Sequence, residues 1–317
     1  MKVVVIGGTG HVGTYMIPQL VALGHEVTVV SRGQRSPYQD HPAWQSVQMV
    51  QMDREADEKL AEFGPKIRSM QADIVIDMIC FTEASARHLV EALRGHVQHF
   101  LHCGTIWIYG PSSVVPATED QPRHPFGDYG IQKAAIERYL WREARQNGFP
   151  VTLLHPGHIV GPGWNPINPQ GHLNTAVFAK LARGEAITLP NLGMETLHHV
   201  HADDVAQSFI KAMQYWSASI GESFHVVSSG ALTLRGYAEA IAAHFGQTAN
   251  LQYLPWDDWR ATVSEDEARA TYDHIAHSPN ASIEKARRLI DYQPRYTSLQ
   301  AIFEAVDWLI ANGKLMI

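Results

Sequence analysis

The sequence contains only two cysteines in 317 residues, Cys80 and Cys103, and each lies within an apolar stretch that is typical of a strand. Two cysteines are too few for a disulfide framework, which favours a reducing compartment. There is also no run of about 18 apolar residues, the length that a membrane-spanning helix needs. The apolar stretch at the amino terminus, 2–6, is too short for a secretory signal. We therefore expect a cytoplasmic protein with no membrane partner.

Positive charge is scarce as well, with 25 lysines and arginines against 32 acidic residues and a net charge of -7. Such a chain has no general attraction to phosphate backbones or anionic lipids, so we expect a small-molecule partner and no nucleic acid. Apolar residues make up 45% and charged residues 18%, a composition typical of a globular core rather than a disordered chain. At roughly 100 to 200 residues per domain, the length indicates one large or two modest domains.

Strand-length apolar runs alternate with helical patterns throughout the first half of the chain. This alternation predicts an α/β fold with a doubly wound parallel sheet of the Rossmann type. The expected strands are 2–6, 26–30, 47–52, 73–79, 99–103 and 151–155, and the expected helices are 12–23, 55–70, 83–94 and 129–147.

The composition changes after His155 to a segment rich in glycine, proline, asparagine and histidine, 156–172. A polar connection of that length is often a binding element. Beyond it we expect helices at 173–183, 202–216, 233–245, 282–290 and 298–312, with short strands at 186–189, 223–227 and 250–254. The sequence thus predicts a dinucleotide-binding domain, 1–155, and a smaller C-terminal α+β substrate lid, 156–317, of which about 202–227 returns to the main sheet.

A glycine-rich turn, Gly7-Gly8-Thr9-Gly10-His11-Val12-Gly13, follows the first expected strand and opens the first expected helix. Glycines permit a tight turn and a close approach of the backbone to a pyrophosphate, and the helix N-terminus offers free N–H groups. A purely structural turn is the alternative. The strand before and the helix after favour dinucleotide binding.

The end of the second strand indicates which dinucleotide is bound. An acid there binds the adenosine ribose hydroxyls, whereas an arginine favours a 2′-phosphate. The chain reads Ser31-Arg32-Gly33-Gln34-Arg35, without an acid, so NADP is favoured over NAD unless both arginines are ordinary solvated charges. Asp53, after the third strand, is either an acceptor for the adenine amino group or a helix N-cap.

Tyr129 and Lys133 are four residues apart and share one face of an expected helix. A free phenol has a pKa near 10, so a tyrosine that exchanges protons at neutral pH needs a nearby cation. Thr105 follows the fifth strand, at the carboxyl edge of the sheet where open α/β folds bind ligands. Each feature alone is weak, and the three together favour a catalytic set over a surface helix.

The sequence resembles the extended short-chain dehydrogenase/reductases, also called the NAD-dependent epimerase/dehydratase family. The resemblance rests on Gly7-x-x-Gly10-x-x-Gly13, the strand end from Thr105 to Tyr109-Gly110, Tyr129-x-x-x-Lys133, His155-Pro156 through Val160-Gly161-Pro162, and the stretch from His199 to Ala206.

The resemblance implies hydride transfer at the nicotinamide C4, with Tyr129 as general acid/base. It implies that Lys133 lowers the pKa of Tyr129 and holds the nicotinamide ribose, that Thr105 binds the reacting oxygen, and that the protein forms a homodimer. The expected cofactor residues are Gly7, Gly10, His11, Val12, Gly13, Ser31, Arg32, Asp53, Lys133 and Pro156.

The loop 163–172 contains no lysine or arginine that would hold a second diphosphate, which favours a smaller sugar, polyol or carbonyl substrate. In the family that the sequence resembles, enzymes that dehydrate sugar nucleotides place an acidic pair directly after the hydroxyl residue. Here those positions are Ile106 and Trp107, whose side chains cannot protonate a leaving hydroxyl, so the resemblance disfavours a dehydratase. An epimerase with a transient keto intermediate stays open, as does a non-catalytic redox-sensing or RNA-binding relative. The expected substrate contacts are Trp107, His158, Trp164, Asn165, His172 and Asn174. Despite 18 histidines, no metal is expected.

Overall fold

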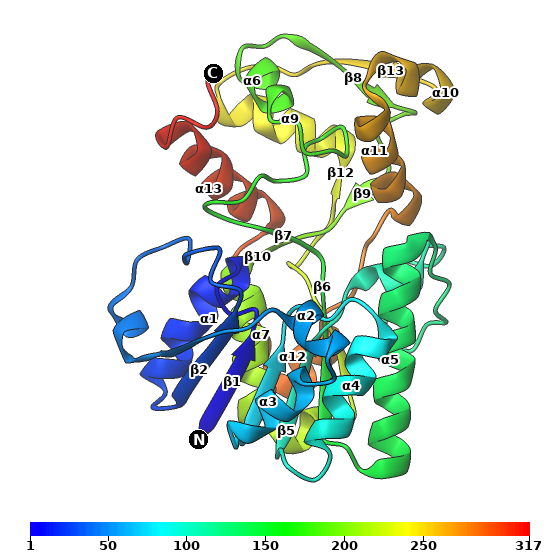
Figure 1. Ribbon diagram of the computed structural model, residues 1–317. Coiled ribbons are helices and arrows are strands. Elements are labelled where there is room, and N and C mark those ends of the chain that lie inside the picture. The colour runs from blue at the N-terminus through cyan, green and yellow to red at the C-terminus, as the bar shows by residue number, and fades with distance from the viewer.

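Seven parallel strands form the central sheet, in the order β11-β6-β5-β4-β1-β2-β3. The computed structural model describes residues 1–317 (Figure 1). Consecutive residues of the inner strands are buried, because helices cover both faces of the sheet. The strands of this sheet are β1 Lys2–Ile6, β2 Glu26–Ser31, β3 Gln48–Gln51, β4 Ile74–Asp77, β5 His99–Cys103, β6 Val151–Pro156 and β11 Ser223–Val226.

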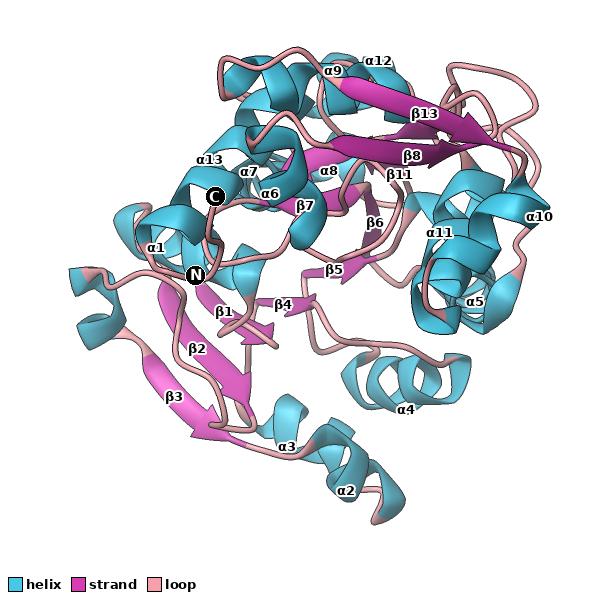
Figure 2. Ribbon diagram, turned by 90° about the horizontal axis from the view of Figure 1, so that it is seen from above, coloured by secondary structure: helices cyan, strands magenta, loops and turns pink.

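Helices cover both faces of this sheet, as the view from above shows (Figure 2). The side chains of α3, α4 and α5 pack with one face, and those of α1, α7 and α12 pack with the other. The helices of this part are α1 His11–Ala22, α2 Arg54–Lys59, α3 Phe63–Ser69, α4 Glu83–Leu93, α5 Gly127–Asn147, α7 Ala202–Gln214, α8 Trp216–Ser219 and α12 Glu284–Ile290. The α/β fold with a doubly wound sheet is confirmed.

The direction of winding reverses between β1 and β4, which are neighbours in the sheet. The chain runs outward from β1 through β2 to β3, then returns to β4 and continues on the other side. Ligands of open α/β sheets bind outside the carboxyl ends of the strands at such a reversal. This edge therefore positions the candidate site.

A smaller α+β lid lies above the carboxyl edge of the sheet (Figure 1). It has its own core, to which α6, α9 and α13 contribute. Its elements are β7 His158–Val160, α6 Ala176–Ala182, β8 Ala186–Pro190, β9 Thr196–Leu197, β10 His199–His201, β12 Leu232–Thr233, α9 Leu234–His244, β13 Asn250–Leu254, α10 Trp256–Trp259, α11 Glu265–His277 and α13 Ser298–Ala311. No helix combines the length and the apolar character needed to cross a membrane.

Two expected helices differ from the structure. The helix expected at 55–70 is two helices, α2 and α3, because the chain turns between them through Ala61, whose φ is +56°. The helix expected at 173–183 begins only at Ala176, where the Asn174 side chain accepts a 3.0 Å bond from the Ala176 N–H. The segment 202–227 supplies α7 and β11, and β11 pairs in parallel with β6.

Candidate functional site

The glycine-rich turn connects β1 to α1 at the point where the winding reverses. Gly7 has a φ of +84°, and a Cβ on Gly13 would lie 1.9 Å from the Gly8 carbonyl oxygen, so both positions require glycine. Gly10 is the N-cap of α1 and has no side chain to occupy the free N–H groups of the first turn. These N–H groups and the positive end of the helix dipole are suited to an anion such as a pyrophosphate.

A groove of about 600 Å³ extends from this turn along the carboxyl ends of β1, β2 and β3. Among the predicted cofactor residues, those lining it are Gly7, Gly10, Ser31, Arg32 and Asp53. The predicted residues His11, Val12, Gly13, Lys133 and Pro156 lie outside its lining. The groove therefore offers groups suited to the pyrophosphate and adenosine part of a dinucleotide.

The charges in this groove are unevenly paired. Arg54 is buried and donates 2.7 Å bonds to Asp77 and Glu58, so its charge is neutralised. Arg32 and Arg35 are exposed and form no ion pair. Asp53 caps α2 by accepting a 3.2 Å bond from the Ala56 N–H while it also lines the groove. This end of the groove therefore holds two arginines without an ion pair, beside a carboxylate that bonds only to a backbone N–H.

Lys133 is buried at the carboxyl ends of β4 and β5. Its ammonium donates 2.8 Å hydrogen bonds to the backbone oxygens of Cys80 and Cys103, which fix its position. The Nζ atom lies 5.8 Å from the centroid of the Tyr129 ring and 5.0 Å from that of Phe81, a residue of the groove. Burial lowers the pKa of Lys133 from its ordinary value. The predicted Tyr129/Lys133 pair thus lies beside the groove.

Tyr129 and Thr105 approach each other across the same edge. Burial of the phenol raises the pKa of Tyr129 to about 12, and the neighbouring Thr105 hydroxyl acts in the opposite direction. Tyr129 nevertheless keeps 43% of its surface exposed, so a ligand can reach the residue. The phenol is protonated at neutral pH, and further positive charge next to it is needed to stabilise the phenolate.

A buried chain of polar groups holds the backbone of Thr105. The Thr105 N–H donates to His155 Nδ1 at 3.2 Å, so Nε2 carries the proton and donates to Glu137 at 3.2 Å. Glu137 in turn accepts two bonds from Arg123, at 2.9 and 3.0 Å. Glu137 lies four residues after Lys133 on α5, a spacing that places Tyr129, Lys133 and Glu137 on one side of the helix. The sequence prediction did not include Glu137 or Arg123.

Replacing Glu137 by glutamine is expected to lower the free energy of unfolding by about 3 kcal/mol at neutral pH, because Arg123 would lose its buried partner. Burial alone would raise the pKa of Glu137, but His155 and Arg123 outweigh it and lower that pKa to about 2. The carboxylate therefore contributes stability above its ordinary pKa of 4.5, and this contribution is lost as the pH falls toward 2. Unfolding by guanidinium should show that the difference in unfolding free energy between the wild type and Glu137→Gln becomes smaller as the pH falls from 4.5 toward 2.

Glu55→Gln is the matched control, since the Glu55–Lys59 pair is exposed. Its unfolding free energy should stay close to that of the wild type. An equally small effect of Glu137→Gln would show that the buried chain contributes little.

Aromatic residues of the lid gather around Trp107, which follows Thr105. The Trp107 ring lies 5.9 Å from the Tyr129 ring and 6.2 Å from that of His158, so three predicted residues lie together. His277 stacks on Trp107 at 4.3 Å, and His274 meets its edge at 5.3 Å. Both histidines belong to α11, a helix that the sequence prediction missed.

A capping box at the start of α11 is the signal that could have revealed this helix. Ser264 and Glu267 each bind the other's backbone N–H, the pattern of serine followed three residues later by glutamate. With that helix assigned, His274 and His277 fall in its last turn.

The other predicted substrate contacts do not gather around Tyr129. Trp164 stacks on His11 at 5.2 Å, which places it over the start of α1. Asn165 is exposed in the same loop. His172 and Asn174 line a separate cavity of about 400 Å³ in the lid, where His172 is bonded to Asn168 and Gln170.

Asp77, Cys80 and His102 offer three possible metal ligands within 4.8 Å of one another. Asp77 already accepts a 2.7 Å bond from Arg54. Burial raises the pKa of the Cys80 thiol to about 12, and its Sγ donates to the Thr82 backbone oxygen at 3.6 Å. We therefore assign no metal to this group.

Residues 3–226 match the model of the NAD dependent epimerase/dehydratase family. The chain belongs to this family. The membership predicted from the motifs is thus confirmed, and the protein is an NAD(P)-dependent enzyme of the oxidoreductase or epimerase type.

Relatives in this family carry several different names. The chain is 23% identical to the chloroplast stem-loop binding protein of 41 kDa b of Arabidopsis thaliana, covering 98% of this chain and 80% of that protein. It is 26% identical to 2′-dehydrokanamycin reductase of Streptomyces kanamyceticus, covering 84% and 72%. The UDP-glucose 4-epimerase of Thermotoga maritima shares the fold, with a TM-score of 0.75 and 20% identity over 98% of this chain and 99% of that one.

Proposed function

We propose that the protein is an NADP-preferring oxidoreductase that interconverts a hydroxyl and a carbonyl group on a small sugar, polyol or related compound. The observation that carries this proposal is the convergence of Thr105 and Lys133 on Tyr129, beside a groove that begins at the glycine turn. A relative named as a reductase supports a redox reaction.

The cofactor supplies hydride transfer at the nicotinamide C4 when it is bound. The glycine turn would hold its pyrophosphate, and Ser31 and Arg32 would hold its adenosine half. Tyr129 moves the proton at the substrate oxygen, and Thr105 donates a hydrogen bond to that oxygen. The ammonium of Lys133 stabilises the phenolate form of Tyr129. The resemblance to the family supports these roles and also a homodimer.

Dehydration is disfavoured by the residues after Thr105. Ile106 and Trp107 form a 3₁₀ turn there, and neither side chain can protonate a leaving hydroxyl. Epimerisation through a keto intermediate is the second candidate, supported by the family match. One relative is named as a stem-loop binding protein, but nucleic-acid binding by this chain is disfavoured by its net charge of -7.

Incubation of the protein with NADP or NAD and a panel of sugars and hydroxy compounds tests the proposal. Stoichiometric formation of reduced cofactor is expected, with the oxidised product identified by NMR. An isomer formed without accumulated reduced cofactor would indicate an epimerase instead. Loss of water from the substrate, or salt-dependent RNA retention without any turnover, would contradict the proposal.

Replacing Arg32 by alanine is expected to weaken NADP binding selectively, by roughly 1.5 to 3 kcal/mol, because a charge-assisted bond to the 2′-phosphate would be lost. NAD has no such phosphate, and its affinity should hardly change. Calorimetric titration of both cofactors measures the difference. Arg142→Ala, at an exposed position of α5, is the control and should leave both affinities unchanged. Equal losses of affinity for NADP and NAD in Arg32→Ala would indicate that Arg32 is an ordinary solvated charge that does not bind the 2′-phosphate.

A further inference from the structure

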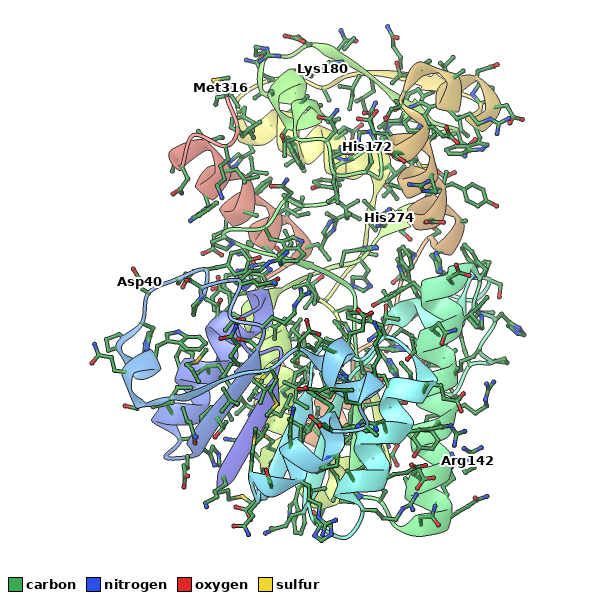
Figure 3. The ribbon with its side chains drawn as sticks, viewed as in Figure 1. Asp40, Arg142, His172, Lys180, His274 and Met316 are labelled. Carbon is green, nitrogen blue, oxygen red and sulfur yellow. The ribbon has the colours of Figure 1, made fainter.

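A cluster of histidines faces Tyr129 from the lid side. His158 and His199 are direct partners in the parallel pair of β7 and β10, with ring centroids 5.5 Å apart. His274 approaches from α11, and its ring lies 5.0 Å from that of His158. Figure 3 shows His274 on the part of α11 nearest the main sheet. Three elements of the lid thus bring imidazoles together next to Trp107 and Tyr129.

The polar atoms of this cluster are incompletely paired. Neither ring nitrogen of His158 or His199 has a hydrogen-bond partner, although all four are buried. Leaving a buried polar group without a partner is destabilising, so native structures rarely do so without a reason. His274 and His277 each use Nδ1 for a 2.6 Å bond to the backbone oxygen four residues earlier, which leaves Nε2 as an acceptor. A ligand with hydroxyl groups would satisfy these atoms.

The cluster carries no fixed positive charge. Burial lowers the pKa of His199 to about 3 and that of His158 well below its ordinary value, so both rings are neutral at pH 7. After burial, the charges that most influence the pKa of His158 belong to other histidines, and no lysine or arginine is among them. These histidines are His274, His199, His198 and His277. A neutral imidazole offers one donor and one acceptor, which matches a hydroxyl group. A phosphate has acceptors only and is bound by cations or N–H groups.

Aromatic rings complete the surroundings of these imidazoles. Trp107 lies between the histidines and Tyr129, and Phe126 stacks on His277 at 4.0 Å. Apolar ring surfaces beside a few convergent polar atoms are typical of sites that bind small hydroxylated molecules.

We propose that His158, His199 and His274 form the substrate-recognition site, and that its ligand is an uncharged polyhydroxylated compound, a sugar or cyclitol without phosphate. This inference rests on the proposed function, because it takes Tyr129 as the reacting end of the same site. It extends that function by assigning an uncharged, hydroxyl-bearing ligand to these histidines.

Saturation-transfer NMR on the NADP-loaded protein tests the inference, with D-glucose and myo-inositol as uncharged probes and UDP-glucose as the diphosphate probe. At least one uncharged probe should bind the wild type, and UDP-glucose should not bind more tightly. His158→Phe keeps a ring of similar size but removes both nitrogens, and it should weaken probe binding at least about tenfold. His274→Phe should reproduce the loss from a different element.

His244→Phe is the matched control, since His244 lies on α9 and pairs with Asp307 outside the cluster. It should bind the probes like the wild type. NADP affinity, measured calorimetrically in every variant, should stay unchanged and shows that each protein is folded.

Tighter binding of UDP-glucose, binding of neither uncharged probe, or full binding by His158→Phe would overturn the inference while the proposed oxidoreductase function stands. Failure to bind NADP at all would instead contradict the proposed function.

Discussion

Replacement of Tyr129 by phenylalanine is expected to lower kcat by about 100- to 10,000-fold, the usual contribution of a general acid/base group. The substitution removes the hydroxyl that exchanges the substrate proton and leaves the ring that packs against Trp107 in place. Cofactor affinity should therefore remain nearly unchanged. Steady-state kinetics with the substrate found in the panel, together with calorimetric titration of NADP, measures both quantities.

Tyr215→Phe is a matched control because Tyr215 is 42% exposed, close to the 43% of Tyr129, and follows α7 away from the groove. It should keep wild-type kinetics. Turnover by Tyr129→Phe within a few-fold of the wild type would show that another group moves the proton.

Replacement of Lys133 by methionine is expected to lower kcat by about 100-fold or more and also to weaken cofactor binding. Methionine keeps a long side chain, but the cation that stabilises the Tyr129 phenolate is lost. Burial already raises the pKa of Tyr129 to about 12. Removing the ammonium that lies 5.8 Å from its ring is expected to raise this pKa further. Alcohol oxidation requires the phenolate form of Tyr129, so its rate increases with pH. In Lys133→Met this increase should occur at higher pH than in the wild type.

The pH profile of kcat separates this role from a merely structural one. The backbone oxygens of Cys80 and Cys103 lose their buried donor in Lys133→Met, so stability also falls and is followed by thermal unfolding. A loss of stability with an unshifted pH profile would indicate that Lys133 only fixes these two oxygens.

Much of the sheet could be predicted from local pattern. β1 and β5 have the expected bounds, since buried parallel strands are continuous apolar runs with clear ends. The glycine turn was also predictable, because its glycines are required by local backbone geometry at Gly7 and Gly13. The position of Thr105 followed from the rule that parallel strands end at one edge, and the pairing of Lys133 with Tyr129 followed from their four-residue spacing on a helix.

The lid side of the site was not predictable in the same way. His274 and His158 come together only through the packing of α11 against the lid, a contact between elements far apart in the sequence. The loop after Gly161 was predicted to reach the substrate, but Trp164 instead stacks on His11 near the glycine turn. No local periodicity encodes which face of a polar loop meets its neighbour.

Transfer of deuterium from NADPH that carries deuterium at both C4 positions to the carbonyl carbon of the substrate tests the central claim most directly. The transfer is followed by NMR in the wild type and in Tyr129→Phe, with NADPH binding confirmed in both. We expect one deuterium per turnover to appear in the product of the wild type, and at least about a 100-fold slower transfer in the variant. Product that forms without deuterium, or equal transfer rates in the two proteins, would contradict hydride transfer assisted by Tyr129.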